Sequence, residues 1–348
     1  MMRRNVLLAG AAVVVLVAAA ALFGSHAPVA PVVSQNRPVG VNPAYVYSMG
    51  GKFDRSFSEA LYRGAERVKA ATGTPYADFE VSHETQFEQA YRHFASRGHD
   101  PVIGVGFSQT DAVKRVAKQY PHTHFMLIDG NINLPNVRAV EFREEEGSFL
   151  VGVLAAMASK SGKIGFVGGM DIPLIRRFAC GYGQGIKYAN PKATVLVNMV
   201  GTTPEAWTDP ARGSEVARGQ FDRGVDVVYA AAGTTGIGVL QAAADRKKLA
   251  IGVDSNQNYM HPGTMLTSMV KKVDNAAYEA VMDLKAGHWQ SGHFVLGLKE
   301  GGVDWAYDQY NKALITPAMK AKVEQVKADI IAGRIKVHDY ESDGKCVY

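Results

Sequence analysis

Short apolar runs alternate with segments of helical periodicity along most of this chain. We expect strands at residues 44–48, 100–107 and 124–129, with helices at 58–71, 110–119 and 144–160. Strands and helices that alternate at this period are typical of parallel sheets joined by right-handed crossovers. The pattern therefore predicts an α/β fold.

The same order of elements restarts near residue 163. Strands are expected at 163–167, 194–200, 226–231, 249–254 and 265–270, with helices at 178–189, 213–222 and 236–246. The chain has 348 residues, which exceeds the size at which a single core keeps growing. We therefore expect two lobes of similar construction with a cleft between them.

The two halves share landmarks as well as an element order. In each half a glycine pair follows the first strand, a phenylalanine lies seven residues before another glycine, and an aspartate closes a later strand. These residues are Gly50-Gly51, Phe57, Gly64 and Asp129 in one half and Gly168-Gly169, Phe178, Gly185 and Asp254 in the other. Ligands of open α/β sheets bind outside the carboxyl ends of the strands, near helix amino termini with free N–H donors. Two facing sheets would therefore enclose a ligand between these landmarks.

Phe57 and Phe178 occupy equivalent positions in the two halves. They could form two apolar walls that hold a flat ring from both faces, because aromatic pairs stabilise one another beyond simple burial. The spacing is equally compatible with each phenylalanine being the first core residue of its helix.

Asp129 and Asp254 each end a predicted strand. A carboxylate at such a position can accept two hydrogen bonds, which suits vicinal hydroxyls or the N–H groups of a base. The alternative is that each aspartate caps a turn. Because an aspartate ends the corresponding strand in both halves, a role in ligand binding is favoured.

Three further side chains could contact a ligand, and each has a structural alternative. Asp54 precedes the first helix and suits either an N-terminal cap or a ligand acceptor. Lys271 follows an apolar strand and could donate to a hydroxyl or pair with Asp254, although lysines are ordinarily exposed. Trp207 could close one edge of a pocket or pack between lobes.

A turn of small residues at 233–238, GTTGIG, leads into a predicted helix. Backbone N–H groups near Gly233 could approach a polar ligand closely. The order of residues differs from the GxGxxG fingerprint of dinucleotide-binding proteins. We therefore expect no nucleotide cofactor.

The amino-terminal residues indicate export. Arg3 and Arg4 precede an apolar run from Val6 to Phe23, and a segment rich in proline and valine continues to Pro43. This arrangement is typical of a signal peptide with a linker, but the run is also just long enough for an uncleaved membrane anchor. A periplasmic or other extracytoplasmic location follows in both cases.

Charge and metal-ligand spacing exclude several classes of function. The net charge of +5 is spread thinly, which indicates a solvated surface and no nucleic-acid partner. The ten histidines show no metal-ligand pattern, so we expect no metal. The two cysteines, Cys180 and Cys346, could form one bridge in an oxidising compartment, but spacing leaves this open.

Several segments together resemble the basic membrane protein (BMP) family of ABC-transporter substrate-binding proteins, whose members include purine nucleoside receptors. The segments are GKFDRSF at 51–57, VEFREEEGSFLVG at 140–152, KIGFVGG at 163–169, AAGTTGIG at 231–238, IGVDSNQ at 251–257 and LTSMVK at 266–271. The resemblance covers about residues 44 to 338.

The resemblance implies a type I periplasmic binding protein fold, with two Rossmann-like parallel-sheet lobes joined by a three-strand hinge. It implies that the chain passes from one lobe to the other near Glu141, Asp254 and Gln290. After a signal or anchor and linker at 1–43, the expected lobes are 44–140 plus 255–290 and 141–254 plus 291–348.

The resemblance also implies a monomer that binds a purine nucleoside or nucleobase in the cleft and passes it unchanged to an ABC transporter permease. The implied ligand contacts are Asp54, Phe57, Asp129, Phe178, Gly233, Asp254 and Lys271. Ser58 stands where the family commonly has asparagine, so we expect it to alter the base contacts, and the lipid-attachment cysteine of many members is absent.

Two other functions remain open from the sequence. A membrane-anchored sensor could use the same fold and cleft with an uncleaved first helix. A nucleoside-acting hydrolase could use Asp129 and Asp254 as a general acid and base, although the sequence supplies no nucleophile with an adjacent base, metal cluster or phosphate loop.

Overall fold

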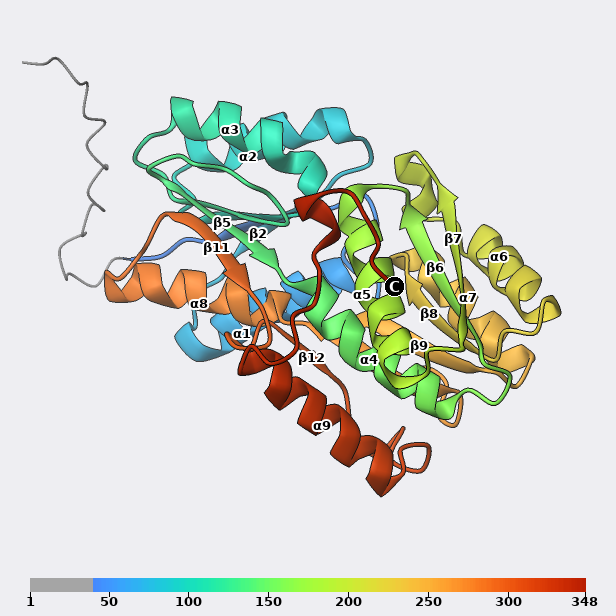
Figure 1. The fold of residues 1–348 in the computed structure, drawn as a ribbon. Coiled ribbons are helices and arrows are strands. Elements are labelled where there is room, and N and C mark those ends of the chain that lie inside the picture. Colours follow the sequence, from blue (N-terminus) through green and yellow to red (C-terminus); the bar gives the residue numbers. More distant parts are fainter. Residues whose placement is uncertain (1–39) are drawn as a thin grey trace, which may run out of the picture. The chain divides into compact units, whose positions relative to one another are not determined.

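The computed structural model describes residues 40–348. The expected signal or anchor, from Val6 to Phe23, lies outside these described residues. None of the helices within residues 40–348 is long and apolar enough to cross a membrane. The strands of this region form two six-stranded sheets (Figure 1).

The first sheet is parallel throughout and has the strand order β11-β5-β4-β3-β1-β2. Its strands are β1 (Ala44–Tyr47), β2 (Ala77–Glu80), β3 (Val102–Val105), β4 (Phe125–Ile128), β5 (Val137–Phe142) and β11 (Gly292–Leu296). Its helices are α1 (Phe57–Thr72), α2 (Phe87–Ser96), α3 (Thr110–Gln119) and α8 (Val273–Ala286). Helices α2 and α3 lie together, and α1 packs against α8 (Figure 1).

The side chains of β1 show why this sheet is buried on both faces. Tyr45 and Tyr47 belong to the core cluster that includes α1 and α8, whereas Ala44 and Val46 belong to the cluster beneath α2 and α3. Successive strand residues point to opposite faces, so a strand covered on both sides must be apolar at every position. This explains the continuous apolar runs in the sequence.

The second sheet has the order β12-β10-β9-β8-β6-β7 and is parallel except for β12, which is antiparallel to β10. Its strands are β6 (Lys163–Met170), β7 (Thr194–Gly201), β8 (Val227–Ala231), β9 (Leu249–Asp254), β10 (Met265–Lys271) and β12 (Val303–Trp305). The remaining helices are α4 (Glu144–Ala158), α5 (Pro173–Ala189), α6 (Pro210–Asp222), α7 (Thr234–Asp245) and α9 (Pro317–Ile331). Short 3₁₀ helices occur at Glu84–Gln86, Phe107–Gln109, Pro204–Trp207 and Tyr340–Ser342.

The predicted repeat is confirmed by the strand order. The first sheet reads β2-β1-β3-β4-β5 from one edge, and the second reads β7-β6-β8-β9-β10. Asp129 directly follows β4 and Asp254 ends β9, so the two aspartates lie at equivalent places. The sixth strand of each sheet, β11 or β12, comes from the last third of the chain.

The chain passes between the sheets three times. It does so from β5 to α4, between β10 and β11, and between β11 and β12. The crossing segments are joined by backbone hydrogen bonds: the N–H of Arg143 donates to the carbonyl of Leu296 at 3.1 Å, and that of Lys272 to the carbonyl of Gly302 at 2.8 Å. They therefore lie side by side.

Two of the expected crossing positions were wrong. The expected first lobe includes 255–290, but β10 within that range pairs with β9 in the second sheet. Conversely, β11 pairs with β5 in the first sheet, although 291–348 was expected in the second lobe. The chain therefore passes from one sheet to the other after Lys271 and again after Leu296. The sheet that a strand joins is decided by its pairing partner and not by its position in the chain. The remaining lobe boundaries stay a prediction.

The three helices expected at 178–189, 213–222 and 236–246 all begin earlier, and two of them begin at a proline. α5 begins at Pro173 and α6 at Pro210, because proline suits the first helical position, where no N–H partner is needed. Phe178 therefore lies inside α5. Strand β6 also continues to Met170, so Gly168 and Gly169 lie within the strand and not after it.

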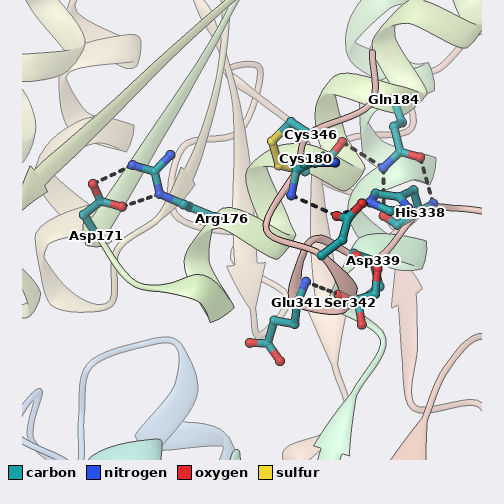
Figure 2. Close-up of a disulfide and its surroundings, with 11 residues drawn as sticks. Asp171, Arg176, Cys180, Gln184, His338, Asp339, Glu341, Ser342 and Cys346 are labelled. Atoms are coloured by element: carbon teal, nitrogen blue, oxygen red, sulfur yellow. Dashed lines mark hydrogen bonds and ion pairs between the residues drawn. A yellow bond between two sulfur atoms is a disulfide. The ribbon is translucent and has the colours of Figure 1, made fainter.

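The carboxyl-terminal segment is fastened to α5 (Figure 2). Cys180 of α5 and Cys346 form a disulfide, with their Cα atoms 5.1 Å apart. The amide of Gln184 donates to the carbonyl of His338 at 2.9 Å, and the N–H of His338 donates back to the Gln184 side chain at 2.8 Å. The structure thus pairs the two cysteines, which spacing left open.

This disulfide should contribute strongly to stability. It closes a loop of 166 residues, and restricting such a loop in the unfolded chain typically stabilises a fold by about 2 to 5 kcal/mol. We expect a reductant to lower the free energy of unfolding, measured with urea, by that amount. A Cys180→Ser/Cys346→Ser variant should show the lower value with or without reductant, and an unchanged wild-type protein under reducing conditions would contradict this assignment.

Candidate functional site

A cavity lies where residues that follow the strand ends of both sheets meet. The space between these residues measures about 790 Å³, including space that is open to solvent. The first sheet and its loops contribute Ser48, Met49, Gly50, Asp54, Phe57, Glu84, Gly106, Phe107, Ser108 and Asp129. The second contributes Leu174, Ile175, Phe178, Pro204, Trp207, Ala231, Ala232, Gly233, Val253, Asp254 and Lys271. Eight of the nine side chains or glycines predicted from the sequence therefore line one cavity.

Ser58 is the predicted residue that the structure places elsewhere. Its side chain is fully buried, and its hydroxyl lies 2.9 Å from the hydroxyl of Ser48, which does line the cavity. Ser58 lies at the second position of α1, on the helix face that packs inward. Ser58 therefore does not line the cavity, and its effect on the base contacts stays a prediction.

The two predicted phenylalanines approach the same ammonium group. The Nζ atom of Lys271 lies 4.8 Å from the ring centroid of Phe57 and 5.8 Å from that of Phe178. Phe178 is 2% exposed and also belongs to the core, whereas Phe57 is only partly buried. Each ring thus packs on the core and lines the cavity, so the two alternatives from the sequence are compatible.

Lys271 is buried in a group of acidic side chains. Its Nζ atom lies 2.6 Å from Oδ2 of Asp129 and 2.7 Å from Oε1 of Glu144. Of the alternatives left open by the sequence, Lys271 is neither exposed nor in a salt bridge with Asp254. Burial alone lowers the pKa of this lysine, but the negative charges of Asp129, Glu144 and Asp254 outweigh burial and raise it. The ammonium group stays charged.

The pKa of Asp129 is raised as well, to about 7. Burial is the main cause, the ammonium of Lys271 offsets it only in part, and the charge of Glu144 adds to the rise. One oxygen, Oδ1, is buried and makes no hydrogen bond. A donor on a bound ligand could satisfy that oxygen.

Asp254 faces the cavity from the other sheet. Its Oδ2 atom accepts a hydrogen bond of 2.6 Å from the hydroxyl of Ser56, and burial raises its pKa. Both Asp129 and Asp254 have a backbone φ of +62°, which L-residues rarely adopt. Strain of this kind persists where the surroundings impose it and is common at functional sites. The same unusual conformation at equivalent positions supports a common role.

Asp54 caps helix α1 and also lines the cavity. Its carboxylate accepts hydrogen bonds from the backbone N–H groups of Ser56, Ser58 and Glu59 at 2.9, 2.9 and 3.0 Å. Burial raises its pKa to about 7 in spite of these bonds. The carboxylate thus caps the first turn of α1, and Asp54 also lines the cavity although it is only 3% exposed.

Trp207 and Gly233 form one edge of the cavity. Gly233 has a φ of +56° and precedes helix α7, so its backbone conformation favours glycine. A Cβ atom at Gly169 would collide with the ring of Trp207. The glycine of β6 therefore makes room for the indole that closes this edge.

Sequence reasoning missed Glu144 and Arg177. Glu144 to Glu146 occupy the first turn of α4, where negative charge complements the helix dipole, yet Glu144 is fully buried. It pairs with Lys271 and also with Arg177 of α5, whose Nη1 atom lies 3.1 Å from Glu144 Oε2. In the sequence, the one sign of this buried ion pair is the run of three consecutive glutamates at the start of an otherwise apolar helix.

Among residues 40–348, no group of three or more His, Cys, Asp or Glu is placed to hold a metal.

Comparison with solved structures shows the class of protein. The crystal structure of an ABC transporter solute-binding protein from Aeropyrum pernix superposes with a TM-score of 0.78 at 28% identity, covering 86% of this chain and 94% of that one. Together with the two parallel sheets, this shows a type I periplasmic binding protein fold.

The chain belongs to the Bmp family of PnrA-like ABC transporter substrate-binding proteins, whose pattern matches residues 44–341. The nucleoside-binding protein BmpA of the ABC transporter of Lactococcus lactis is 31% identical, covering 97% of this chain and 99% of its own. The CD4+ T-cell-stimulating antigen of Listeria monocytogenes is 32% identical, covering 84% and 87% respectively.

The raised pKa of Asp129 makes stability depend on pH. The folded protein holds this proton up to about pH 7, whereas the unfolded chain releases it near the ordinary value of about 4. The carboxyl group therefore contributes stability at low pH that is lost as pH rises towards 7. We expect Asp129→Asn to flatten the decline in unfolding free energy between pH 4.5 and 7.5 by roughly 2 to 4 kcal/mol. Urea titrations at several pH values would measure this, and parallel curves for variant and wild type would contradict it.

Proposed function

We propose that the protein is the substrate-binding component of an ABC importer that holds a purine nucleoside or a related nucleobase in the cavity between the two sheets. The observation that carries the proposal is that aromatic rings and carboxyl groups from both halves line one cavity. Among them are the rings of Phe57 and Phe178 and the carboxyl groups of Asp54, Asp129 and Asp254.

The composition of the cavity suits a flat, donor-bearing ligand. Stacking on an aromatic side chain typically contributes about 1 to 3 kcal/mol per base. Carboxylate oxygens accept hydrogen bonds from ribose hydroxyls or base N–H groups, while the ammonium of Lys271 donates to a hydroxyl or ring oxygen. The free oxygen of Asp129 gives the ligand one acceptor that the protein itself leaves unused. The nucleoside-binding relative from Lactococcus lactis supports the same ligand class.

Two linked parts of the proposal concern location and partner. The protein acts outside the cytoplasm as a monomer, exported by the signal or held by the anchor proposed at residues 6–23, and it delivers the ligand to a permease. Sequencing the amino terminus of the protein purified from its native membrane fraction separates export with cleavage from anchoring.

Truncating one wall of the cavity should weaken nucleoside binding. We expect Phe57→Ala to reduce the affinity for inosine or adenosine by about 5- to 150-fold, the loss of one stacking contact. Isothermal titration calorimetry measures this. Phe79→Ala is the matched control, because that ring is 39% exposed and does not line the cavity. Equal affinities for the two variants would count against the stacking role.

A binding protein returns its ligand unchanged. After prolonged incubation with inosine or adenosine at pH 5.5 and 7.5, we expect chromatography of the released material to recover the intact nucleoside at both values. Recovery of free base and ribose would instead favour hydrolysis by the carboxyl groups of Asp129 and Asp254, and denatured protein serves as the background control.

A further inference from the structure

A second, smaller cavity adjoins the first. It encloses about 290 Å³, including space that is open to solvent. Phe107, Asp129 and Leu174 line both cavities, so the smaller one continues the larger. A ligand held in the main cavity could therefore extend a substituent past these three residues.

Carboxylates dominate the smaller cavity. Asp129, Glu141, Glu144 and Glu341 line it, and Arg177 is the one basic residue of the described chain that does so. The close basic partners of these four acidic groups are Arg177, Lys271 and His293, and the histidine is charged only when it is protonated. Acidic groups and hydrogen-bond acceptors therefore outnumber the permanent cations around the cavity.

The guanidinium of Arg177 is already shared among several carboxylates. It lies 3.1 Å from Glu144, 2.9 Å from Asp339 and 2.6 Å from Glu341. Arg177 and Lys271 together supply two positive charges to Asp129, Glu144, Asp339 and Glu341, which leaves the cluster incompletely compensated. A further cation would be favoured there.

Asp129 lies at the junction of the two cavities and supplies an independent sign of a ligand. The residue is 7% exposed, its Oδ2 atom pairs with Lys271, and its Oδ1 atom has no hydrogen-bond partner. A buried carboxylate oxygen without a donor is costly, typically by about 1 to 3 kcal/mol. A donor on the ligand would remove that cost.

Phe107 completes this junction with an aromatic face. Its side chain is 37% exposed, although it lines both cavities. Cations bind favourably over aromatic rings, and ammonium recognition commonly combines such a ring with carboxylates. The combination of Phe107 with the acidic lining fits an ammonium group better than a neutral or anionic one.

We propose that the smaller cavity is a subsite for a protonated amine carried by the ligand of the main cavity. The inference rests on the proposed nucleoside-binding function and narrows its ligand class to nucleosides or nucleobases with an amine substituent. Phosphorylated ligands are disfavoured at this end, because an anion would face four carboxylates.

The carboxyl-terminal segment builds one wall of this subsite. Glu341 lies in the short helix Tyr340–Ser342, between the contacts of His338 with Gln184 and the disulfide of Cys346 (Figure 2). The disulfide and these contacts hold Glu341 against α5. The end of the chain therefore takes part in selecting the ligand.

Calorimetry with matched pairs of analogues tests the subsite. The pairs are 5′-amino-5′-deoxyadenosine against adenosine, and N6-(2-aminoethyl)adenosine against N6-ethyladenosine, so that either end of the nucleoside is probed. We expect the amine of at least one pair to bind about tenfold tighter than its neutral partner. This preference should fall to about twofold or less in Glu141→Gln and in Glu341→Gln.

Asp343→Asn provides the matched control, because Asp343 lies in the same segment, pairs with His338 and lines neither cavity. It should keep the full amine preference. The inference is overturned if neither amine is preferred, or if both glutamine variants retain the preference. Binding of adenosine without any amine preference would leave the proposed function intact.

If neither these four nucleosides nor inosine and adenine bind, the proposed function fails and a separate measurement decides the subsite. Ethylammonium chloride should then raise the thermal unfolding midpoint of the wild-type protein above the value in sodium chloride at equal ionic strength. The difference should vanish in Glu141→Gln/Glu341→Gln. Equal midpoints in the two salts would overturn the subsite.

Discussion

The structure of the site depends on one buried cation. Lys271 is 2% exposed and is held between Asp129 and Glu144. Removing a charge from water costs several kcal/mol, and only close partners of opposite sign offset that cost. Because the partners follow β4, begin α4 and end β10, this ion group fixes three elements relative to one another. A bound ligand meets a charge pattern that is already in place.

The ion group also lies next to the chain crossings. Glu144 follows the first crossing, at Arg143, and Lys271 directly precedes the second, at Lys272. Any rotation of the two sheets about the crossing segments would therefore act directly on the geometry of these charges. Arg177 extends the network from Glu144 to the carboxyl-terminal segment, which the disulfide fastens to the same helix. Ligand contacts, crossings and chain end are parts of one connected arrangement.

The local features of this fold were predictable from the sequence. Strand periodicity and the repeated landmarks placed Asp129 and Asp254 at equivalent strand ends, and they brought Phe57 and Phe178 to one cavity. The sequence did not reveal that β10 joins the second sheet and β11 the first. Both strands are short, and only their long-range pairing partners distinguish them. Glu144 resembled a simple dipole complement, because its partner Lys271 is 127 residues away in sequence. The inward direction of Ser58 depends on how α1 packs, which spacing does not reveal.

A crystal structure of the protein with inosine would show whether the buried ion group and the two rings form a nucleoside site. We predict that the base lies between the rings of Phe57 and Phe178, and that its sugar or base donors contact Asp129 and Asp254. The ammonium of Lys271 should keep its contacts with Asp129 and Glu144. A nucleoside bound away from these two rings, or a cavity that stays unoccupied at saturating inosine, would contradict this prediction.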